Sequence, residues 1–263
     1  RPLYTRFPLP PHRVPRRLRA LVYRLLSSMA RHTAPTAFTF PAWPKDLSAD
    51  TLSLLRSMLT IDLLPKTNKS IVNIDPIWPE GKAYAVVFTH DVDSDWAFEH
   101  TDNVAPLLKI ETAAGVRSAW YFVVNNIPAH ELLTRGLQRD GHEIGFHCYN
   151  HDHRFPFLSE SRMRRRLEQC RPFLERFQVA GLRSANYLKT PRFLSIMGER
   201  FEYDLSFRDS YHGAGGAHGC STVFPFRIAG CPLLEIPTTV PDDYDLFARG
   251  LSPEEALKVQ QEC

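Results

Sequence analysis

The sequence lacks the features that mark several classes of protein. Its 263 residues contain no apolar run long enough to span a bilayer. Five cysteines are scattered, odd in number and without a Cys-x-x-Cys pair, so neither a disulfide framework nor a cysteine zinc site is expected. No internal repeat is visible, and the glycine cluster at 213–219 has no phosphate-loop pattern. These absences favour a globular protein of a reducing compartment, the cytoplasm.

Acidic residues are missing from the start of the chain. Residues 1–45 hold eight arginines, one lysine and no acid, whereas the rest has 23 basic and 29 acidic residues. We interpret residues 1–46 as a basic arm rich in proline and arginine. Within it, residues 13–31 have the apolar spacing of an amphipathic helix with arginines on its other face. Packing of this apolar stripe on the protein is favoured, contact with a membrane surface is the alternative, and nucleic acid is not an expected partner.

Both ends of the sequence suggest a longer natural protein. The chain begins with arginine, and no secretory signal with a clear cleavage site is visible. Near the other end, Ser252-Pro253-Glu254-Glu255 has the serine cap, early proline and third-position glutamate that begin a helix. The sequence stops at Cys263 without a helix terminator or a following strand. We therefore expect the natural chain to continue.

The pattern of elements predicts an α/β domain over residues 81–263. Residues 47–80 are expected to form an extension with a helix and a short strand, which ends where prolines and a glycine interrupt the chain. From there strands and helices alternate, which favours a parallel sheet or barrel whose site lies at the carboxyl ends of the strands. The expected strands are 83–90, 118–124, 143–148, 182–187, 203–208 and 233–239. The expected helices are 103–114, 129–139, 159–177 and 191–200.

Acids and histidines gather at the ends of two of these strands. Asp91 and Asp93 close the first strand and share a side of it, whereas His90 points the other way. The third strand ends at His147, and His151 follows four residues later. Two histidines and one carboxylate, with a coordination position left open, are typical of a catalytic zinc-type site. The second acid would be free to act as a general base.

These residues resemble the NodB-homology polysaccharide deacetylases, carbohydrate esterase family 4. The similarity rests on Ala83–Asp93, on SAWYFVV at 118–124 and on DGHEIGFHCYNHDH at 140–153, and it extends over roughly residues 80–240. The resemblance implies a distorted (β/α)7-type barrel. The six strands counted here fit such a barrel with its final C-terminal strand missing from this chain.

The resemblance also implies roles for individual residues. Asp91 would be the base and Asp93 a metal ligand, as in the variant of the first motif that separates the two aspartates by one residue. His147 and His151 would be the other ligands, and zinc is the favoured metal, with cobalt, nickel or manganese as alternatives. Arg183 would orient the base. The remaining candidates are Tyr149, Asn150 and Tyr187 for substrate binding and Asp204 or Asp209 for the fourth motif.

The expected function is hydrolysis of carbon–nitrogen bonds other than peptide bonds, by de-N-acetylation of an N-acetylated amino-sugar polysaccharide or oligosaccharide through metal-activated water. The family's fifth motif supplies a general-acid histidine from a late strand, but the last histidine here, His218, precedes the sixth strand, so this motif is absent. Two alternatives stay open, the first because the separated-aspartate variant also occurs in relatives of other specificity and the second because this motif is absent. One is an amide or ester hydrolase of a non-carbohydrate substrate, and the other is a non-catalytic relative that binds metal or glycan.

Overall fold

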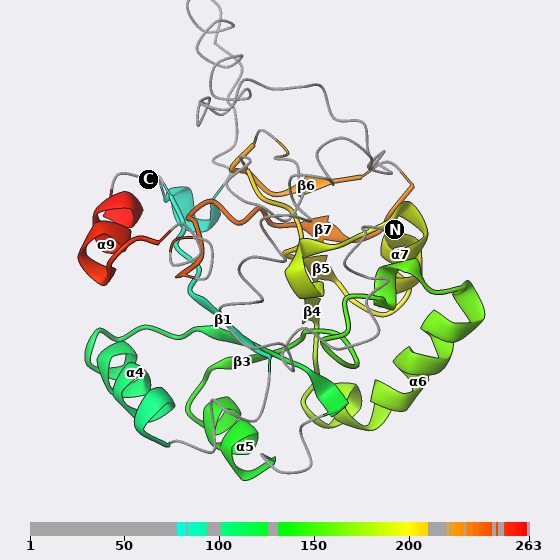
Figure 1. Cartoon of the computed structure of the whole chain (residues 1–263), viewed down its shortest axis with the longest axis horizontal. Coiled ribbons are helices and arrows are strands. Elements are labelled where there is room, and N and C mark those ends of the chain that lie inside the picture. The colour runs from blue at the N-terminus through cyan, green and yellow to red at the C-terminus, as the bar shows by residue number, and fades with distance from the viewer. Residues whose placement is uncertain are drawn as a thin grey trace, which may run out of the picture.

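The computed structural model describes residues 78–82, 84–93, 101–125, 131–209, 220, 222–228, 230–243, 246 and 250–261 (Figure 1). The predicted arm at 1–46 and nearly all of the extension at 47–80 lie outside these residues. What is described begins with a short 3-10 turn, η3 (Pro79–Gly81), and ends with helix α9 (Pro253–Gln261). No helix in these ranges has the length and apolar character needed to span a membrane.

One mostly parallel sheet organises the described chain. Its strand order is β1-β2-β3-β4-β5-β7-β6, and only β6 runs antiparallel to its neighbour. The strands are β1 (Thr89–Val92), β2 (Ala119–Phe122), β3 (Glu143–Phe146), β4 (Gly181–Leu182), β5 (Tyr203–Asp204), β6 (Phe226–Arg227) and β7 (Leu234–Glu235). The predicted α/β class is confirmed. The six expected strands correspond to β1–β5 and β7, and β6 is an addition that the sequence did not predict.

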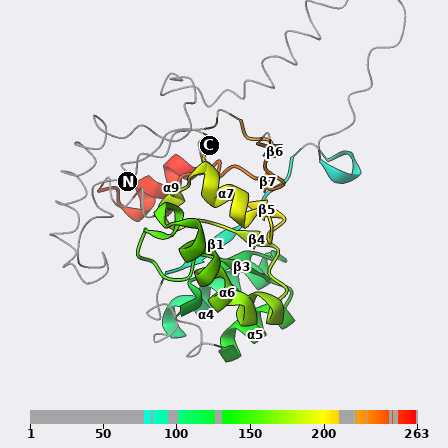
Figure 2. The ribbon, with the colours of Figure 1, turned by 90° about the vertical axis from the view of Figure 1, so that its right-hand side faces the viewer.

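Helices connect the parallel strands in regular alternation. They are α4 (Thr101–Ala113), α5 (Glu131–Arg139), α6 (Glu160–Arg176) and α7 (Pro191–Met197). Figures 1 and 2 show these helices around the outside of the row of strands, where α5 packs on β3 and α6 packs on α7. All four lie close to their predicted ranges, and α6 runs through Pro172 as one helix.

The last helix begins with the predicted capping box. The Ser252 N–H donates to Glu255 Oε2 at 2.8 Å, and the Glu255 N–H donates to Ser252 Oγ at 3.2 Å. These two bonds satisfy backbone donors that an α-helix leaves free at its start. The sequence signal at this position is therefore confirmed.

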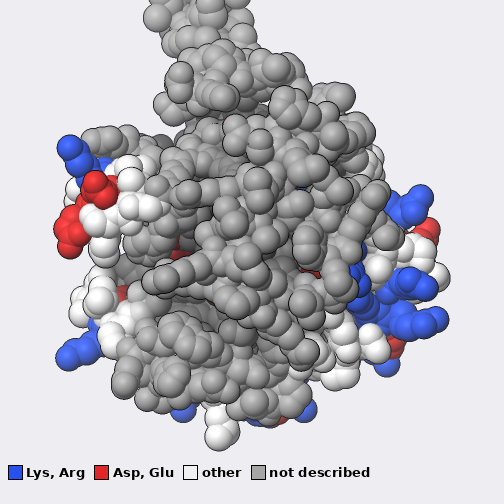
Figure 3. All heavy atoms as spheres, in the orientation of Figure 1, with Lys and Arg blue, Asp and Glu red and all other residues white. Residues whose placement is uncertain are grey.

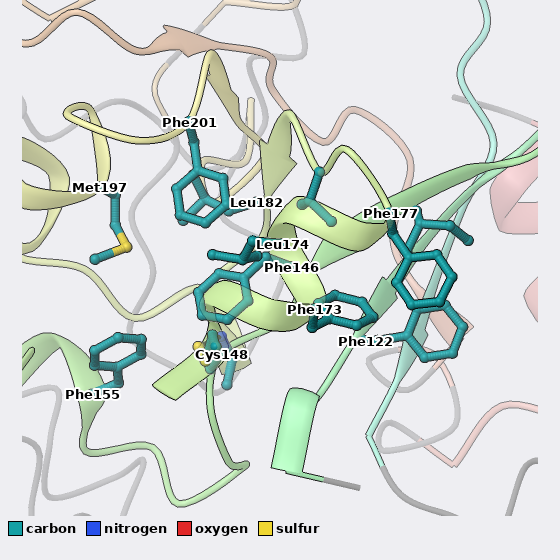
Figure 4. Close-up of a cluster of buried hydrophobic side chains, with 14 of the residues drawn as sticks. Phe122, Phe146, Cys148, Phe155, Phe173, Leu174, Phe177, Leu182, Met197 and Phe201 are labelled. Atoms are coloured by element: carbon teal, nitrogen blue, oxygen red, sulfur yellow. Dashed lines mark hydrogen bonds between the residues drawn. The ribbon is translucent and has the colours of Figure 1, made fainter. Parts of the chain in front are cut away.

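The main hydrophobic core lies between the sheet and the helices. The Phe146 ring of β3 stacks on Phe201 at a centroid distance of 5.2 Å and meets the edge of Phe155 at 6.2 Å (Figure 4). A smaller cluster around Tyr121 and Leu205 occupies the opposite face of the sheet. Both faces are thus covered, as is usual for parallel sheets.

The first strand is shorter than predicted. The apolar run was expected to form a buried strand at 83–90, but β1 begins at Thr89, and Tyr84, Val86 and Val87 are exposed. The reason lies in the register. Thr89 pairs with Ala119, the first residue of β2, so β2 offers no partner to the residues before Phe88. The predicted strand at 182–187 is also only partly correct, because β4 is followed at once by the 3-10 turn η6 (Ala185–Tyr187).

Candidate active site

The carboxyl ends of β1 and β3 bring the predicted acids and histidines together. Both strands run parallel to β2 and pair with it on opposite sides. Asp91 lies within β1 and Asp93 directly follows it, while His147 directly follows β3. His151 lies four residues further, in the segment that leads to the 3-10 turn η5 (Phe155–Phe157).

Three of these side chains point at a common centre. Asp93 Oδ1 lies 3.2 Å from His147 Nε2 and 3.3 Å from His151 Nε2. The three candidate ligand atoms all lie within 4.8 Å of one another. Ligand atoms that surround one zinc ion tetrahedrally at about 2.1 Å are roughly 3.4 Å apart, so the observed spacing fits a divalent cation.

The second nitrogen of each imidazole is also engaged. His147 Nδ1 lies 2.8 Å from the carbonyl oxygen of Arg183, which can only accept, so Nδ1 carries a proton and Nε2 is the nitrogen left to bind a metal ion. His151 Nδ1 lies 3.2 Å from His153 Nε2. Outer partners of this kind fix the tautomer and ring orientation of metal-binding histidines. The donor set therefore fits a metal ion in chemistry as well as in spacing.

Electrostatics inside the cluster favour a charged carboxylate among imidazoles. The Asp93 side chain is 54% exposed, so its partial desolvation, which would raise its pKa, is outweighed by the hydrogen bond from His147 and the charge of His151, and that pKa is held well below its usual range. Burial would lower the pKa of His147, but the carboxylates of Asp91 and Asp93 outweigh it and raise that pKa. For His153, burial and the neighbouring His151 charge both act downward, lowering its pKa to about 3, so its ring is neutral at physiological pH.

Asp91 lies beside this cluster and is held by Arg183. Arg183 Nη1 donates to Asp91 Oδ1 at 2.9 Å, and Nη2 donates to Thr89 Oγ1 at 2.8 Å. The other carboxylate oxygen, Asp91 Oδ2, lies 3.8 Å from His147 Nε2. The Arg183 side chain is only 6% exposed against 28% for Asp91, so the arginine holds the acid from the buried side.

The aromatic residues around Arg183 hold its guanidinium in place. Its Cζ lies 5.1 Å from the ring centre of Tyr121 and 5.8 Å from that of Tyr187, within the range of a cation–π interaction. Tyr121 packs directly over Gly145 on the neighbouring strand, where a side chain would overlap the ring. The Tyr121 hydroxyl meets that of Tyr203 at 3.1 Å.

The other predicted site residues lie in more closed surroundings. Tyr187 is buried between Arg183 and Arg208, whose Cζ lies 4.1 Å from its ring centre. Tyr149 and Asn150 are half-buried, and both contact Arg166 of α6. Substrate binding by these three residues stays a prediction.

The two candidates for the fourth motif are both buried. Asp204 is fully buried on β5, where it accepts a hydrogen bond from Ser206 Oγ at 2.5 Å. Asp209 is nearly buried, and its N–H donates to the carbonyl oxygen of Thr238 at 3.1 Å. Both acids thus belong to the interior of the fold, and a catalytic role for either stays a prediction.

Two further histidines lie away from the cluster. His90 Nε2 meets Glu111 Oε1 of α4 at 2.7 Å, and its ring lies 4.4 Å from that of Trp120. His142 lies just before β3 and contacts Ser118. The alternation of the first strand predicted that His90 points away from Asp91, and its contact with α4 confirms this.

Several residues that shape the site were not predicted from the sequence. Thr89 and Tyr121 support Arg183, and Arg166 contacts the segment that carries His151. Glu235 on β7 lies fully buried next to Asp204. The sequence offered one signal for Glu235, a glutamate inside the apolar run at 233–239. A buried acid in a strand needs a specific partner, so this position could have been recognised as part of a buried polar pair.

Comparison with known proteins agrees with this geometry. The profile of a family described as "Polysaccharide deacetylase" matches residues 79–192, a range that holds Asp91, Asp93, both ligand histidines and Arg183. Over these residues the chain is similar to polysaccharide deacetylases. This similarity supports a hydrolase of the carbohydrate-deacetylating kind, and the cluster of Asp93, His147 and His151 is a possible metal site. No curated protein matches the sequence.

One solved structure shares the fold of the described chain. A protein of Mycobacterium smegmatis assigned as a polysaccharide deacetylase superposes with a TM-score of 0.52 at 22% identity, over 70% of this chain and 72% of its own. Puue allantoinase gives a TM-score of 0.47 at 20% identity, and a polysaccharide deacetylase assigned in Pseudomonas aeruginosa PAO1 gives 0.45 at 21%. The last two matches cover 60% of this chain and 52% of theirs.

Proposed function

We propose that this protein is a metal-dependent hydrolase that removes N-acetyl groups from an amino-sugar polysaccharide or oligosaccharide. The observation that carries the proposal is the arrangement of Asp91 on Arg183, next to the three-ligand cluster of Asp93, His147 and His151. A cluster with one carboxylate and two imidazoles leaves room for water and substrate on the ion it holds. Zinc is the metal that this donor set fits best.

The ligand residues and the base divide the work between them. Asp93, His147 and His151 would hold the cation. A bound divalent cation supplies Lewis-acid polarisation of a carbonyl and acidification of water. Arg183 occupies Asp91 Oδ1, so Oδ2, on the side of His147, is the oxygen that accepts the proton of the attacking water. The same oxygen can return this proton to the departing amine, which completes hydrolysis of the amide.

The test is acetate release from N-acetylated glycan oligomers by zinc-loaded protein, with Asp91→Asn as the decisive variant. We expect kcat to fall by about 10²- to 10⁴-fold, the usual contribution of a general base. Zinc stoichiometry should stay near that of the parent, because Asp91 is not a proposed ligand. Asp93→Asn is the matched control that should lose the metal as well.

The outcomes separate this function from the alternatives. Full activity in Asp91→Asn would refute the role of the base. Hydrolysis of cyclic amides or esters without acetate release from glycans would assign the same site to a non-carbohydrate substrate. Glycan binding without acetate release or hydrolysis of these other substrates would identify a binding module.

A further inference from the structure

The segment that carries His151 is held differently from the strand that carries His147. Its start is tied by main-chain bonds, since the carbonyl oxygens of Cys148 and Tyr149 accept from the N–H groups of Val124 and Asn125 at 3.2 and 2.9 Å. Cys148 has a φ of 72°, a left-handed backbone conformation that residues other than glycine rarely adopt. The chain thus turns sharply out of the sheet directly after His147, and His151 lies beyond that turn.

One guanidinium from α6 bonds to the residues on both sides of His151. Arg166 Nη1 donates to Asn150 Oδ1 at 3.0 Å and to Asp152 Oδ1 at 3.2 Å, and Nη2 donates to Asp152 Oδ2 at 2.8 Å. Asp152 Oδ1 also accepts from the N–H of Arg154 at 2.9 Å. Planar, two-pronged pairing of this kind fixes geometry better than a single ion pair.

This contact is seated on the hydrophobic core. The Arg166 Cζ lies 5.7 Å from the ring centre of Tyr149 and 5.8 Å from that of Phe155, which is fully buried against Phe146 and Phe193. The Arg166 and Asp152 side chains are each only 20% exposed. Burial would raise the pKa of Asp152, but the bonds from Arg166 and Arg154 outweigh it and lower that pKa, so the pair is charged at neutral pH.

Other basic residues of α6 have different surroundings. Basic side chains gather over the side of the molecule that α6 occupies (Figure 3). Arg164, two residues before Arg166, is about half exposed and pairs with Glu160 at 2.9 Å and Glu199 at 2.6 Å. It carries the same charge on the same helix without contacting the segment around His151, so it offers a matched control.

We propose that Arg166 is a positioning residue for the metal centre: through Asn150 and Asp152 it holds the His151 imidazole beside Asp93 and His147 before a metal arrives. The inference rests on the proposed function, since it takes these three residues as the ligands. It predicts a loss of metal affinity when the contact is removed, because metal binding must then also supply the free energy that orders the segment around His151. Loss of an outer partner of a metal ligand typically weakens affinity by about 10- to 100-fold.

The experiment is a competition titration of metal-free protein with zinc and a chromophoric chelator. The variants are Arg166→Gln and Asp152→Asn, which remove the contact from either side, and the control is Arg164→Gln. We expect the parent and the control to bind about one zinc with equal affinity, and both variants to bind it roughly tenfold or more weakly. The readout is a dissociation constant and needs no substrate.

A double variant distinguishes positioning from a general loosening of the fold. If Arg166 acts through His151, Arg166→Gln has nothing further to remove once His151→Ala is present, so the double variant should bind zinc as His151→Ala does. Losses that add in full refute the positioning role, and so does unchanged affinity in both Arg166→Gln and Asp152→Asn. A parent that binds no zinc would instead overturn the proposed metal centre itself.

Discussion

A pair of buried acids on the neighbouring strands β5 and β7 makes the stability of the protein depend on pH. Asp204 of β5 and Glu235 of β7 are register partners on neighbouring strands, and both are fully buried. Ser206 donates to Asp204 Oδ1, but the structure gives no donor among the described residues for Asp204 Oδ2 or for either Glu235 oxygen. The two carboxyl groups lie within hydrogen-bonding reach of each other, so one proton shared between them satisfies both.

The sign of the effect follows from this shared proton. Burial and, for Glu235, the Asp204 charge raise the pKa values of the pair, so the folded protein keeps one proton on it at neutral pH. In the unfolded chain both acids have ordinary pKa values near 4 and hold none. The folded state then binds the extra proton, and the free energy of unfolding falls as pH rises, by about 1.4 kcal/mol per pH unit for one proton.

The perturbation is Glu235→Gln, which keeps a hydrogen-bond donor toward Asp204 and removes the proton that can be lost. From about pH 6 to about pH 7.5 the free energy of unfolding of the parent should fall by about 2 kcal/mol because of this pair. The variant should not show this fall. The upper limit is set by Lys189. Burial lowers the pKa of Lys189 to about 8, although the charges of both acids act in the other direction. Loss of its proton on folding makes the free energy of unfolding rise with pH, which opposes the effect of the acid pair.

Urea unfolding at the two pH values, with chelator present throughout, measures the difference directly. The metal cluster is the same in parent and variant, so any contribution that it makes cancels in the comparison. Glu202→Gln, at an exposed position next to β5, controls for the loss of one carboxylate. The shared-proton account is refuted if Glu235→Gln loses as much stability as the parent between the two pH values.

Three further predictions concern packing and metal. Gly181→Ala should destabilise the fold by about 1–3 kcal/mol, because a Cβ there would overlap the Tyr203 ring on the next strand. Gly136→Ala on α5, where a Cβ meets no other atom, should be neutral or stabilising. Thermal denaturation of the two variants and the parent tests both expectations. Zinc at 100 times its dissociation constant should raise the unfolding free energy by about 2.7 kcal/mol, and chelator should reverse this. His147→Ala should remove the zinc-dependent part without removing the fold, as circular dichroism with and without zinc would show.

Much of the metal cluster could be predicted because its members are close in sequence. His147 and His151 lie four residues apart, and Asp91 and Asp93 stand together at the end of an apolar run. Only the pairing of β1 and β3 with β2 had to be inferred, and alternating strands and helices made parallel order the natural expectation. Arg183 was a candidate because it lies in the fourth predicted strand, at 182–187.

The groups that support the cluster could not be predicted, because their role depends on contacts between distant segments. Arg166 is one of six arginines in α6, and nothing in the local sequence separates it from Arg164. The apolar run before Thr89 predicted a buried strand, but burial depends on a neighbour that the described sheet does not provide there. Apolar spacing reports the tendency of a segment, whereas the partner that covers it is a property of the whole fold.

The first strand shows how structural and candidate catalytic residues depend on each other. Thr89 and Asp91 face Arg183, while His90 between them faces α4 and bonds to Glu111. Glu111 also accepts from Ser118 Oγ at 2.8 Å, which ties α4 to the start of β2. A slip of one residue in β1 would turn His90 toward Arg183 and Asp91 toward the helix. His90 and the candidate base are adjacent in sequence, so the register that His90 helps to fix decides the face on which Asp91 emerges.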